Sequence, residues 1–129
     1  LIDLDTIMKG YFYYDFGDAI RTVVNVAPED EQNHDLITFN SELFEAFVDG
    51  LASNESFLTE EEKQSLPLGA VFMPFIHGLR ALTDYLNNNI YYKVTYENQN
   101  LDRCLSLFNF AEKALAKKEM MAAYIQKCL

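Results

Sequence analysis

The stretch Leu68–Leu86, LGAVFMPFIHGLRALTDYL, decides the fold because its apolar residues recur every three or four positions. This spacing predicts a helix, the longest of the chain, from Leu68 to about Leu86. Pro74 is expected to bend the helix partway along, since proline removes a backbone hydrogen bond. Nearly all of the surface of this helix is apolar, so we expect it to be central. Its apolar face is formed by Leu68, Val71, Phe72, Phe75, Ile76, Leu79 and Leu82.

Three shorter helices are predicted before it. The first runs from Tyr13 to about Val26, with Asp15 as its cap, and ends before Pro28. The second begins with Ser41 as its N-cap and ends near Gly50. The third is a short helix opened by the capping box at 59–62, with Pro67 in the first turn of the long helix that follows. The acidic segment 28–35 between the first two is expected to be a surface loop.

The segments after the long helix and at the start of the chain complete the prediction. Asn87–Asn89 stops the long helix, and Ile90–Tyr96 is rich in aromatic and β-branched residues, which favours an extended segment. A last helix, capped by Asn100, runs toward Ile125, and residues 1–6 resemble the end of a strand. We therefore expect an all-α fold with at most a residual short β-pair, forming one domain over residues 1–129.

Composition restricts the partners. The 129 residues include 20 acidic and 10 basic side chains, for a formal charge of −10, which repels nucleic acid and anionic membranes. No apolar run approaches the length of about twenty residues that a membrane span needs. Cys104 and Cys128 lack the spacing of metal ligands, and we expect both to be free thiols without a chemical role. Free thiols favour a reducing, cytoplasmic setting. The missing starting Met suggests a chain truncated at its N-terminal end.

Asp3 and Asp5 are the candidate metal ligands. They follow an apolar strand end at alternate positions, and paired carboxylates there suit Mg²⁺, which prefers hard oxygen ligands. Such a pair is a weak motif, and ordinary turn acids are the alternative interpretation. The Asp15-Phe16-Gly17 string resembles the metal-binding string of protein kinases and competes for the same role.

The layout resembles the aminoglycoside phosphotransferase and choline kinase superfamily, in which I-D-x-[DEG] is followed by [YF]-D-[LIF]-[GA] at a helix start. Here these strings are Ile2–Asp5 and Tyr14–Gly17. Further strings at Leu66–Ala70, Gly78–Leu86, Tyr91–Lys93 and Asn100–Arg103 are similar to a branch that transfers the γ-phosphoryl of ATP to the anomeric hydroxyl of an N-acetylhexosamine. The resemblance covers nearly the whole chain and implies a kinase C-lobe. Some relatives are labelled mucin desulfatases, but no Cys- or Ser-x-Pro-x-Arg string supports that activity here.

The resemblance assigns roles to individual residues. It implies that Asp3, with Asp5, holds Mg²⁺ and that Asp15 braces the catalytic loop from behind. Arg80 and Tyr91 correspond to residues that hold the sugar. Arg21 and Thr22 are expected to border it. On spacing alone, Arg80 and Asp84 could equally form an ion pair facing water, and His77 is expected to be a satisfied core histidine.

Essential parts of a kinase are absent from the sequence. There is no Gly-rich loop and no H-x-D-x-x-x-x-N string, so no catalytic residue of the loop lies in this chain, which we expect to be inactive alone. ATP and Mg²⁺ are the expected co-substrate and cofactor of the full-length protein, and a small-molecule sugar is its expected substrate. A choline or aminoglycoside kinase and a non-catalytic helical interaction domain with an acidic surface are the alternatives. Self-association is expected through the exposed N-terminal strand around Leu1–Leu4.

Overall fold

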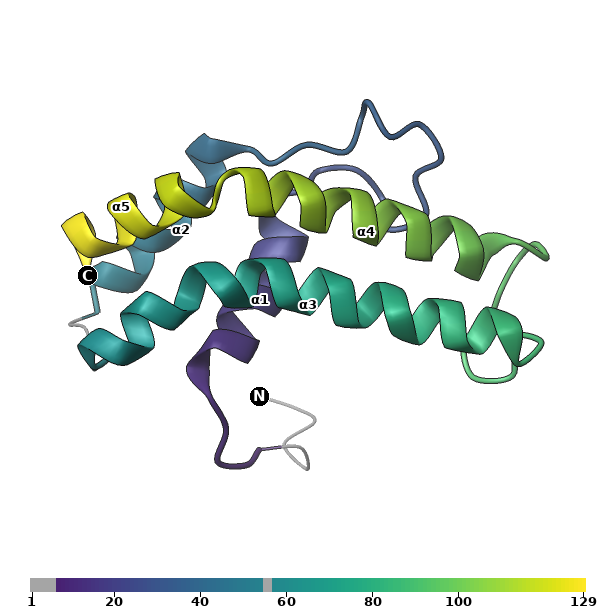
Figure 1. Cartoon of the computed structure of the whole chain (residues 1–129), viewed down its shortest axis with the longest axis horizontal. Helices are drawn as coiled ribbons and strands as arrows, with labels where there is room; N and C mark the ends of the chain where they lie inside the picture. Colours follow the sequence, from purple (N-terminus) through teal and green to yellow (C-terminus); the bar gives the residue numbers. More distant parts are fainter. Residues whose placement is uncertain (1–6, 55–56) are drawn as a thin grey trace.

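A computed structural model describes residues 7–54 and 57–129 of the chain. Within those ranges it is mainly helical, with five helices and no strand, which confirms the all-α prediction. The long helix α3 (Glu60–Leu86) runs antiparallel to α4 (Gln99–Ala116), and α5 (Lys118–Cys128) continues α4 in the same general direction (Figure 1). The helix α1 (Phe12–Val23) crosses behind α3, and α2 (Ser41–Ala52) packs against α5.

The caps of α1 and α2 differ from those predicted. α1 begins at Phe12 with Tyr11 as its N-cap residue, and no side chain caps it. Asp15 therefore lies inside the first turn, where its charge favours the helix dipole, and the prediction that it caps the helix is wrong. The N-cap of α2 is Asn40, whose side chain accepts hydrogen bonds from the backbone N–H groups of Glu42 and Leu43, so Ser41 is the first helical residue instead.

α3 is one continuous helix, although two were predicted. The capping box is present: Thr59 accepts from the Glu62 backbone N–H, and the Glu62 side chain accepts from the Thr59 backbone N–H. Pro67 and Pro74 both lie inside the helix and are buried. The helix therefore continues through Pro67, which does not occupy a first turn.

The buried face of α3 is made of small residues rather than the predicted apolar stripe. Gly69, Ala70, Pro74, Gly78 and Ala81 are buried, together with Leu66, Pro67 and Asp84. These small side chains let α1 and α4 approach closely: a Cβ on Gly69 would strike the Tyr13 carbonyl oxygen, and one on Gly78 would lie 2.7 Å from the Phe108 ring. The close contact fixes where α1 and α4 cross α3.

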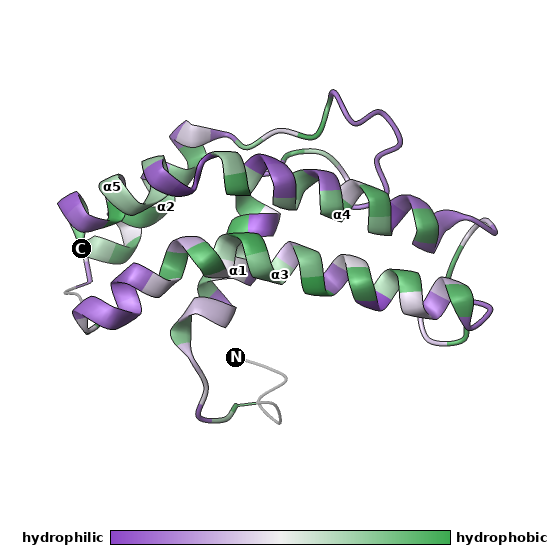
Figure 2. Ribbon diagram, in the orientation of Figure 1, coloured by the Kyte–Doolittle hydropathy of each residue, from purple (hydrophilic) through white to green (hydrophobic). Residues whose placement is uncertain are grey.

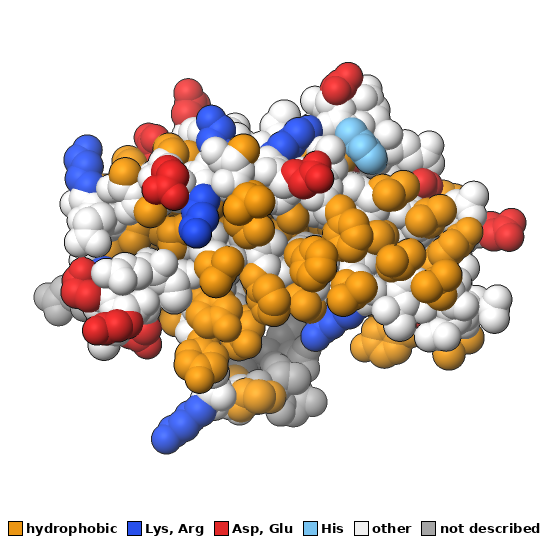
Figure 3. All heavy atoms as spheres, in the orientation of Figure 1, with side chains coloured by type: hydrophobic (Ala, Val, Ile, Leu, Met, Phe, Trp, Pro, Cys, Tyr) orange, Lys and Arg blue, Asp and Glu red, His pale blue; other side chains and the backbone are white. Residues whose placement is uncertain are grey.

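The predicted apolar stripe of α3 instead faces outward in part. Leu68, Phe75 and Leu79 are 54%, 45% and 42% exposed. Figure 2 shows α3 as apolar along most of its length beyond its acidic first turns, and Figure 3 shows apolar side chains covering the middle of this side of the molecule. Apolar periodicity predicted the helix correctly but not which side is buried.

α3 also qualifies as a membrane-spanning helix by length and composition. A window of 18 residues within it has a mean hydropathy of 1.3, with 39% of the window buried. Counting uninterrupted apolar residues missed this window because His77 and Arg80 interrupt the run. One such helix carries little weight, since the core helix of a soluble protein meets the same criterion, and the expected absence of a membrane partner stays a prediction.

The end of α3 and the start of α4 are joined by an irregular segment. Asn88 and Asn89 adopt positive φ angles of 64° and 57°, a conformation that asparagine tolerates better than most residues, and the helix ends there as predicted. Residues 90–98 form no strand, so the predicted extended segment is not part of a sheet. The N-cap position of α4 is Asn98, and Asn100 is a buried residue within the helix, not its cap.

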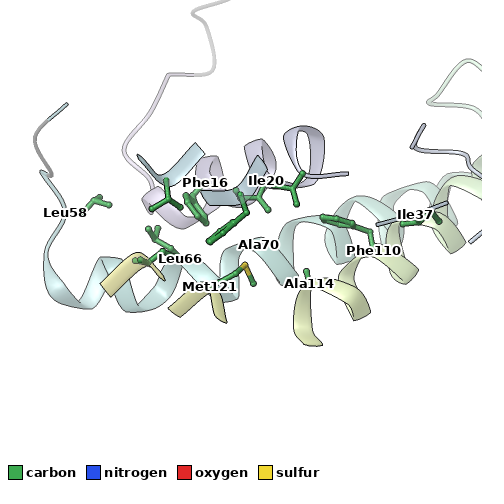
Figure 4. Packing of buried hydrophobic residues seen from close by; sticks show 13 residues of the cluster. Phe16, Ile20, Ile37, Leu58, Leu66, Ala70, Phe110, Ala114 and Met121 are labelled. Carbon is green, nitrogen blue, oxygen red and sulfur yellow. The ribbon is translucent and has the colours of Figure 1, made fainter. Parts of the chain in front are cut away.

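The main hydrophobic core lies toward one end of the molecule. Phe16 and Ile20 of α1 lie over Ala70 of α3 (Figure 4), and the Phe16 ring packs edge to face on Phe44 and Phe47 of α2. The predicted single last helix is interrupted at Lys117, which separates α4 from α5. Cys104 is buried and Cys128 half-buried, and both are free thiols. The cluster consists of Phe16, Ile20, Val24, Ile37, Phe44, Val48, Leu58, Leu66, Ala70, Phe110, Ala114, Met121 and Ile125.

Candidate functional site

A groove of about 570 Å³ lies at the C-terminal end of α3. One wall is the last turns of α3, and the other is the irregular segment that follows the helix. The groove brings together Arg80 and Tyr91, the two residues expected to hold a sugar. We call it the Arg80–Tyr91 groove, and it is lined by Ile76, Leu79, Arg80, Thr83, Asp84, Asn87, Ile90, Tyr91 and Tyr92.

Asp84 holds the second wall in place. Its side chain is only 5% exposed, and its Oδ1 accepts a hydrogen bond of 2.8 Å from the Tyr91 backbone N–H. Its Oδ2 accepts from the Tyr92 backbone N–H at 3.0 Å. Burial acts to raise the pKa of the Asp84 carboxyl, but the hydrogen bonds from Tyr92, Tyr91 and Asn100 outweigh burial and lower it. Asp84 is thus a buried anion that fixes the segment carrying Tyr91, and no ion pair joins it to Arg80 within the described ranges.

Asn100 connects this anchor to α4. Its buried amide nitrogen Nδ2 donates to Asp84 Oδ2 at 2.9 Å and to Asn89 Oδ1 at 3.0 Å. Its Oδ1 accepts a hydrogen bond of 2.6 Å from Arg103 Nη1. The Arg103 guanidinium also lies over the Tyr92 ring, 5.4 Å from the ring centre. The wall of the groove is therefore held by a polar network rather than by apolar packing.

Arg80 and Tyr91 are the accessible groups of the groove. Arg80 is exposed, and among the residues that the structure describes none forms a hydrogen bond or ion pair with it. Tyr91 is 80% exposed, and its ring packs edge to face on Tyr92 with 4.9 Å between ring centres. A guanidinium offers up to five N–H donors, and a tyrosine ring offers a flat face and one hydroxyl. Such a groove can bind a small polar molecule that has hydroxyl groups and one apolar face.

A second, smaller hollow of about 280 Å³ shares Tyr92 with the groove. Arg21 lines it but is engaged: its Nε lies 2.7 Å from Asp18 Oδ1, and its Nη1 contacts Glu29. His77 also has a partner, since its Nε2 lies 3.1 Å from Asp18 Oδ1. Burial lowers the pKa of His77, and the nearby charge of Arg21 lowers it further. The lowered pKa favours the neutral form of this imidazole, which is half-buried beside the groove.

The remaining candidate residues are not gathered at the groove. The Thr22 hydroxyl donates back to the Ala19 carbonyl at 2.9 Å, and Thr22 lines neither hollow. Asp15 is exposed and lines a separate hollow near Tyr11 and Phe57.

The predicted metal ligands Asp3 and Asp5 lie outside the described residues. Within 7–54 and 57–129 no group of three or more His, Cys, Asp and Glu side chains is arranged to hold a metal ion. The Mg²⁺ site therefore stays a prediction from the sequence.

Sequence reasoning missed the roles of Asp84 and Asn100. The spacing of four positions on one helix makes an ion pair of Asp84 with Arg80 one of two open alternatives. The sequence did contain a signal for the burial of Asp84. Asp84 continues the row of small residues that includes Gly78 and Ala81, and this row is the buried face of α3. A carboxylate on a buried row needs hydrogen-bond donors, and the N–H groups of the next segment are the nearest available.

A search against protein-family models finds none that matches this chain.

Proposed function

We propose that this chain is the helical C-lobe part of an ATP-dependent small-molecule kinase whose acceptor, an N-acetylhexosamine, binds in the Arg80–Tyr91 groove. The observation that carries the proposal is the meeting of Arg80 and Tyr91 in one accessible groove. The resemblance of the sequence to a kinase family implies that these two residues hold the sugar. The two residues come from different segments of the chain.

The charge of the groove favours a neutral acceptor. Arg80 brings a positive charge without a counter-ion among the described side chains. Asp84, the one carboxylate among the described lining residues, is buried and already accepts three hydrogen bonds from the protein. Choline and aminoglycosides are cations and would be repelled by Arg80, whereas a sugar offers hydroxyl oxygens to its N–H donors.

The residues of this chain have distinct tasks in the proposed reaction. Arg80 binds sugar hydroxyls and orients the ring, and Tyr91 covers the apolar face of the sugar and excludes water from it. Asp84 keeps Tyr91 in position. The nucleotide cradle and the catalytic base belong to the remainder of the kinase. Mg²⁺, when held by Asp3 and Asp5, stabilises the charge of the transferring phosphoryl group.

Ligand titration of the 129-residue chain tests the groove. Backbone amide chemical shifts are followed by NMR while N-acetylglucosamine, N-acetylgalactosamine, choline or an aminoglycoside is added. We expect the two hexosamines to shift amides of residues 79–92 and the two cations to leave them unchanged. Arg80→Ala and Tyr91→Ala should each remove the response. Tyr96→Ala is the matched control, because Tyr96 is a partly exposed tyrosine that does not line the groove.

Turnover by the full-length protein tests the activity. ATP consumption should depend on a hexosamine, and Arg80→Ala should raise the KM for the sugar far more than it lowers kcat, because Arg80 holds the sugar in ground state and transition state alike. The isolated chain should not consume ATP. Turnover with choline or an aminoglycoside alone would contradict the proposed acceptor, and hexosamine binding that survives Arg80→Ala would contradict the proposed site.

A further inference from the structure

The outward face formed by α3 and α4 is a continuous apolar surface without a partner in the described structure. Phe75 of α3 stacks on Phe108 of α4 with 5.3 Å between ring centres, which joins the two helices into one surface. A shallow groove of about 350 Å³ runs along it. We call this surface the α3/α4 face, and Figure 3 shows it as the field of apolar side chains across the middle of the molecule. Its groove is lined by Leu68, Val71, Phe72, Phe75, Phe108, Ala111, Glu112 and Leu115.

The exposed apolar area of the face can be compared with the apolar area that stable protein interfaces bury. Leu68, Phe75 and Leu115 line the groove of this face, and Leu79 and Leu105 lie one helical turn beyond Phe75 and Phe108 on the same rows; all five are between 42% and 55% exposed. If each large apolar residue presents roughly 200 Å², these five expose on the order of 500 Å². The half-buried Val71, Phe72 and Phe108 add to that total. Stable interfaces bury about 600–1,000 Å² on each partner, and roughly 56–65% of that area is apolar, so about 500 Å² of exposed apolar surface is consistent with an interface of this size.

The charge distribution selects the kind of partner. The chain has a net charge of −10, but among the described residues that line the groove Glu112 is the only charged one. A basic partner would therefore find no complementary charges here. A surface that is itself apolar apart from Glu112 complements the face, and a second copy supplies one.

We infer that two copies of this chain associate through the α3/α4 face, each placing its α3 and α4 on those of the other. The antiparallel pair in one copy then meets the pair in its partner to give four packed helices around the Phe75 and Phe108 rings. A two-fold axis makes the contact self-complementary and closed. The inference does not rest on the proposed kinase activity, and the surface differs from the N-terminal strand suggested by the sequence, which lies outside the described residues.

Sedimentation equilibrium of the 129-residue chain tests the inference. From about 1 μM to about 1 mM, the range that covers moderate and weak complexes, the mass should rise from 14.9 kDa toward twice that value. Phe75→Glu should raise the dissociation constant at least about tenfold, because it buries two unpaired charges at the centre of the dimer. Leu115→Glu should do the same, which keeps the test valid if one variant fails to fold by circular dichroism. Leu36→Glu is the control, since Leu36 is 55% exposed but lies outside the face.

Salt distinguishes apolar from electrostatic association. A contact through the α3/α4 face should persist or strengthen when salt screens the repulsion between two acidic chains. Any of three results would overturn the inference: a monomer throughout the concentration range, a dimer that Phe75→Glu and Leu115→Glu leave intact, or a dimer that moderate salt dissolves.

Discussion

Two glycines at the crossing of α1 and α3 give the sharpest stability prediction. Gly17 faces the backbone of Gly69, and Gly69 faces the backbone of Tyr13. A Cβ on Gly17 would lie 2.5 Å from the Gly69 carbonyl carbon and 2.7 Å from Met73 Cγ. A Cβ on Gly69 would lie 3.0 Å from both the carbonyl carbon and Cβ of Tyr13. Because most of these neighbours are backbone atoms, the two helices must move apart to admit a methyl group.

The expected magnitude follows from two opposed effects. In a helix interior, alanine is favoured over glycine by about 1 kcal/mol. Overpacking a close contact typically costs about 1–3 kcal/mol, and the upper end applies here because backbone atoms cannot rotate away. We therefore expect Gly17→Ala and Gly69→Ala each to lower the free energy of unfolding by about 1–2 kcal/mol in spite of the gain in helix propensity.

Urea unfolding followed by circular dichroism measures this effect, with Gly50→Ala as the matched control. Gly50 also lies within a helix, but a Cβ there meets nothing within 4 Å. Gly50→Ala should therefore raise the free energy of unfolding by about 0.5–1 kcal/mol. If Gly17→Ala or Gly69→Ala matched the stabilisation of Gly50→Ala, the close backbone contact between α1 and α3 would be refuted.

Three further predictions concern the cap of α3, the polar network around Asn100 and the titration of His77. Thr59→Ala should lower the free energy of unfolding by about 1 kcal/mol in the same urea assay, because it removes half of the capping box. Asn100→Ala should lower it by about 1–3 kcal/mol and should speed hydrogen exchange of the Tyr91 amide, since the buried amide loses three hydrogen bonds. The pKa of His77 is lower in the folded than in the unfolded chain, so the unfolded chain binds a proton first as the pH falls below about 6.5. The free energy of unfolding should therefore decline as the pH falls from about 6.5 to the lower pKa of His77 in the folded chain. His77→Gln should flatten this part of a plot of unfolding free energy against pH.

The sequence predicted features that depend on neighbouring residues. The capping box at Thr59 and the stop at Asn87–Asn89 are both present, because each is decided within a few positions. The continuous course of α3 could not be predicted from the same rules. Proline weakens a helix locally, and burial of Pro67 and Pro74 against other elements is a property of the whole fold.

The candidate site was predictable only in part. Arg80 and Tyr91 were selected through a resemblance, and the structure places both in one groove. The supporting network of Asp84 and Asn100 could not be predicted, because helical spacing offered Arg80 as a possible partner of Asp84 and indicated Asn100 as a helix cap. The buried face of α3 was also not predicted. Small side chains at a close helix crossing are more completely buried than the large side chains beside them.

The placement of the main core has a consequence for local unfolding. The cluster of buried apolar residues includes none between Ala70 and Phe110, the half of the α3–α4 pair that carries the groove. That half depends on the polar network around Asp84 and on close contacts such as Gly78 with Phe108. It should therefore open as a separate cooperative unit, at a lower free energy than the core, and native-state hydrogen exchange would show faster opening at residues 78–104 than at Ile20 or Ala114. A molecule bound in the groove would then slow exchange in that unit, because its binding free energy adds to the free energy of opening the unit.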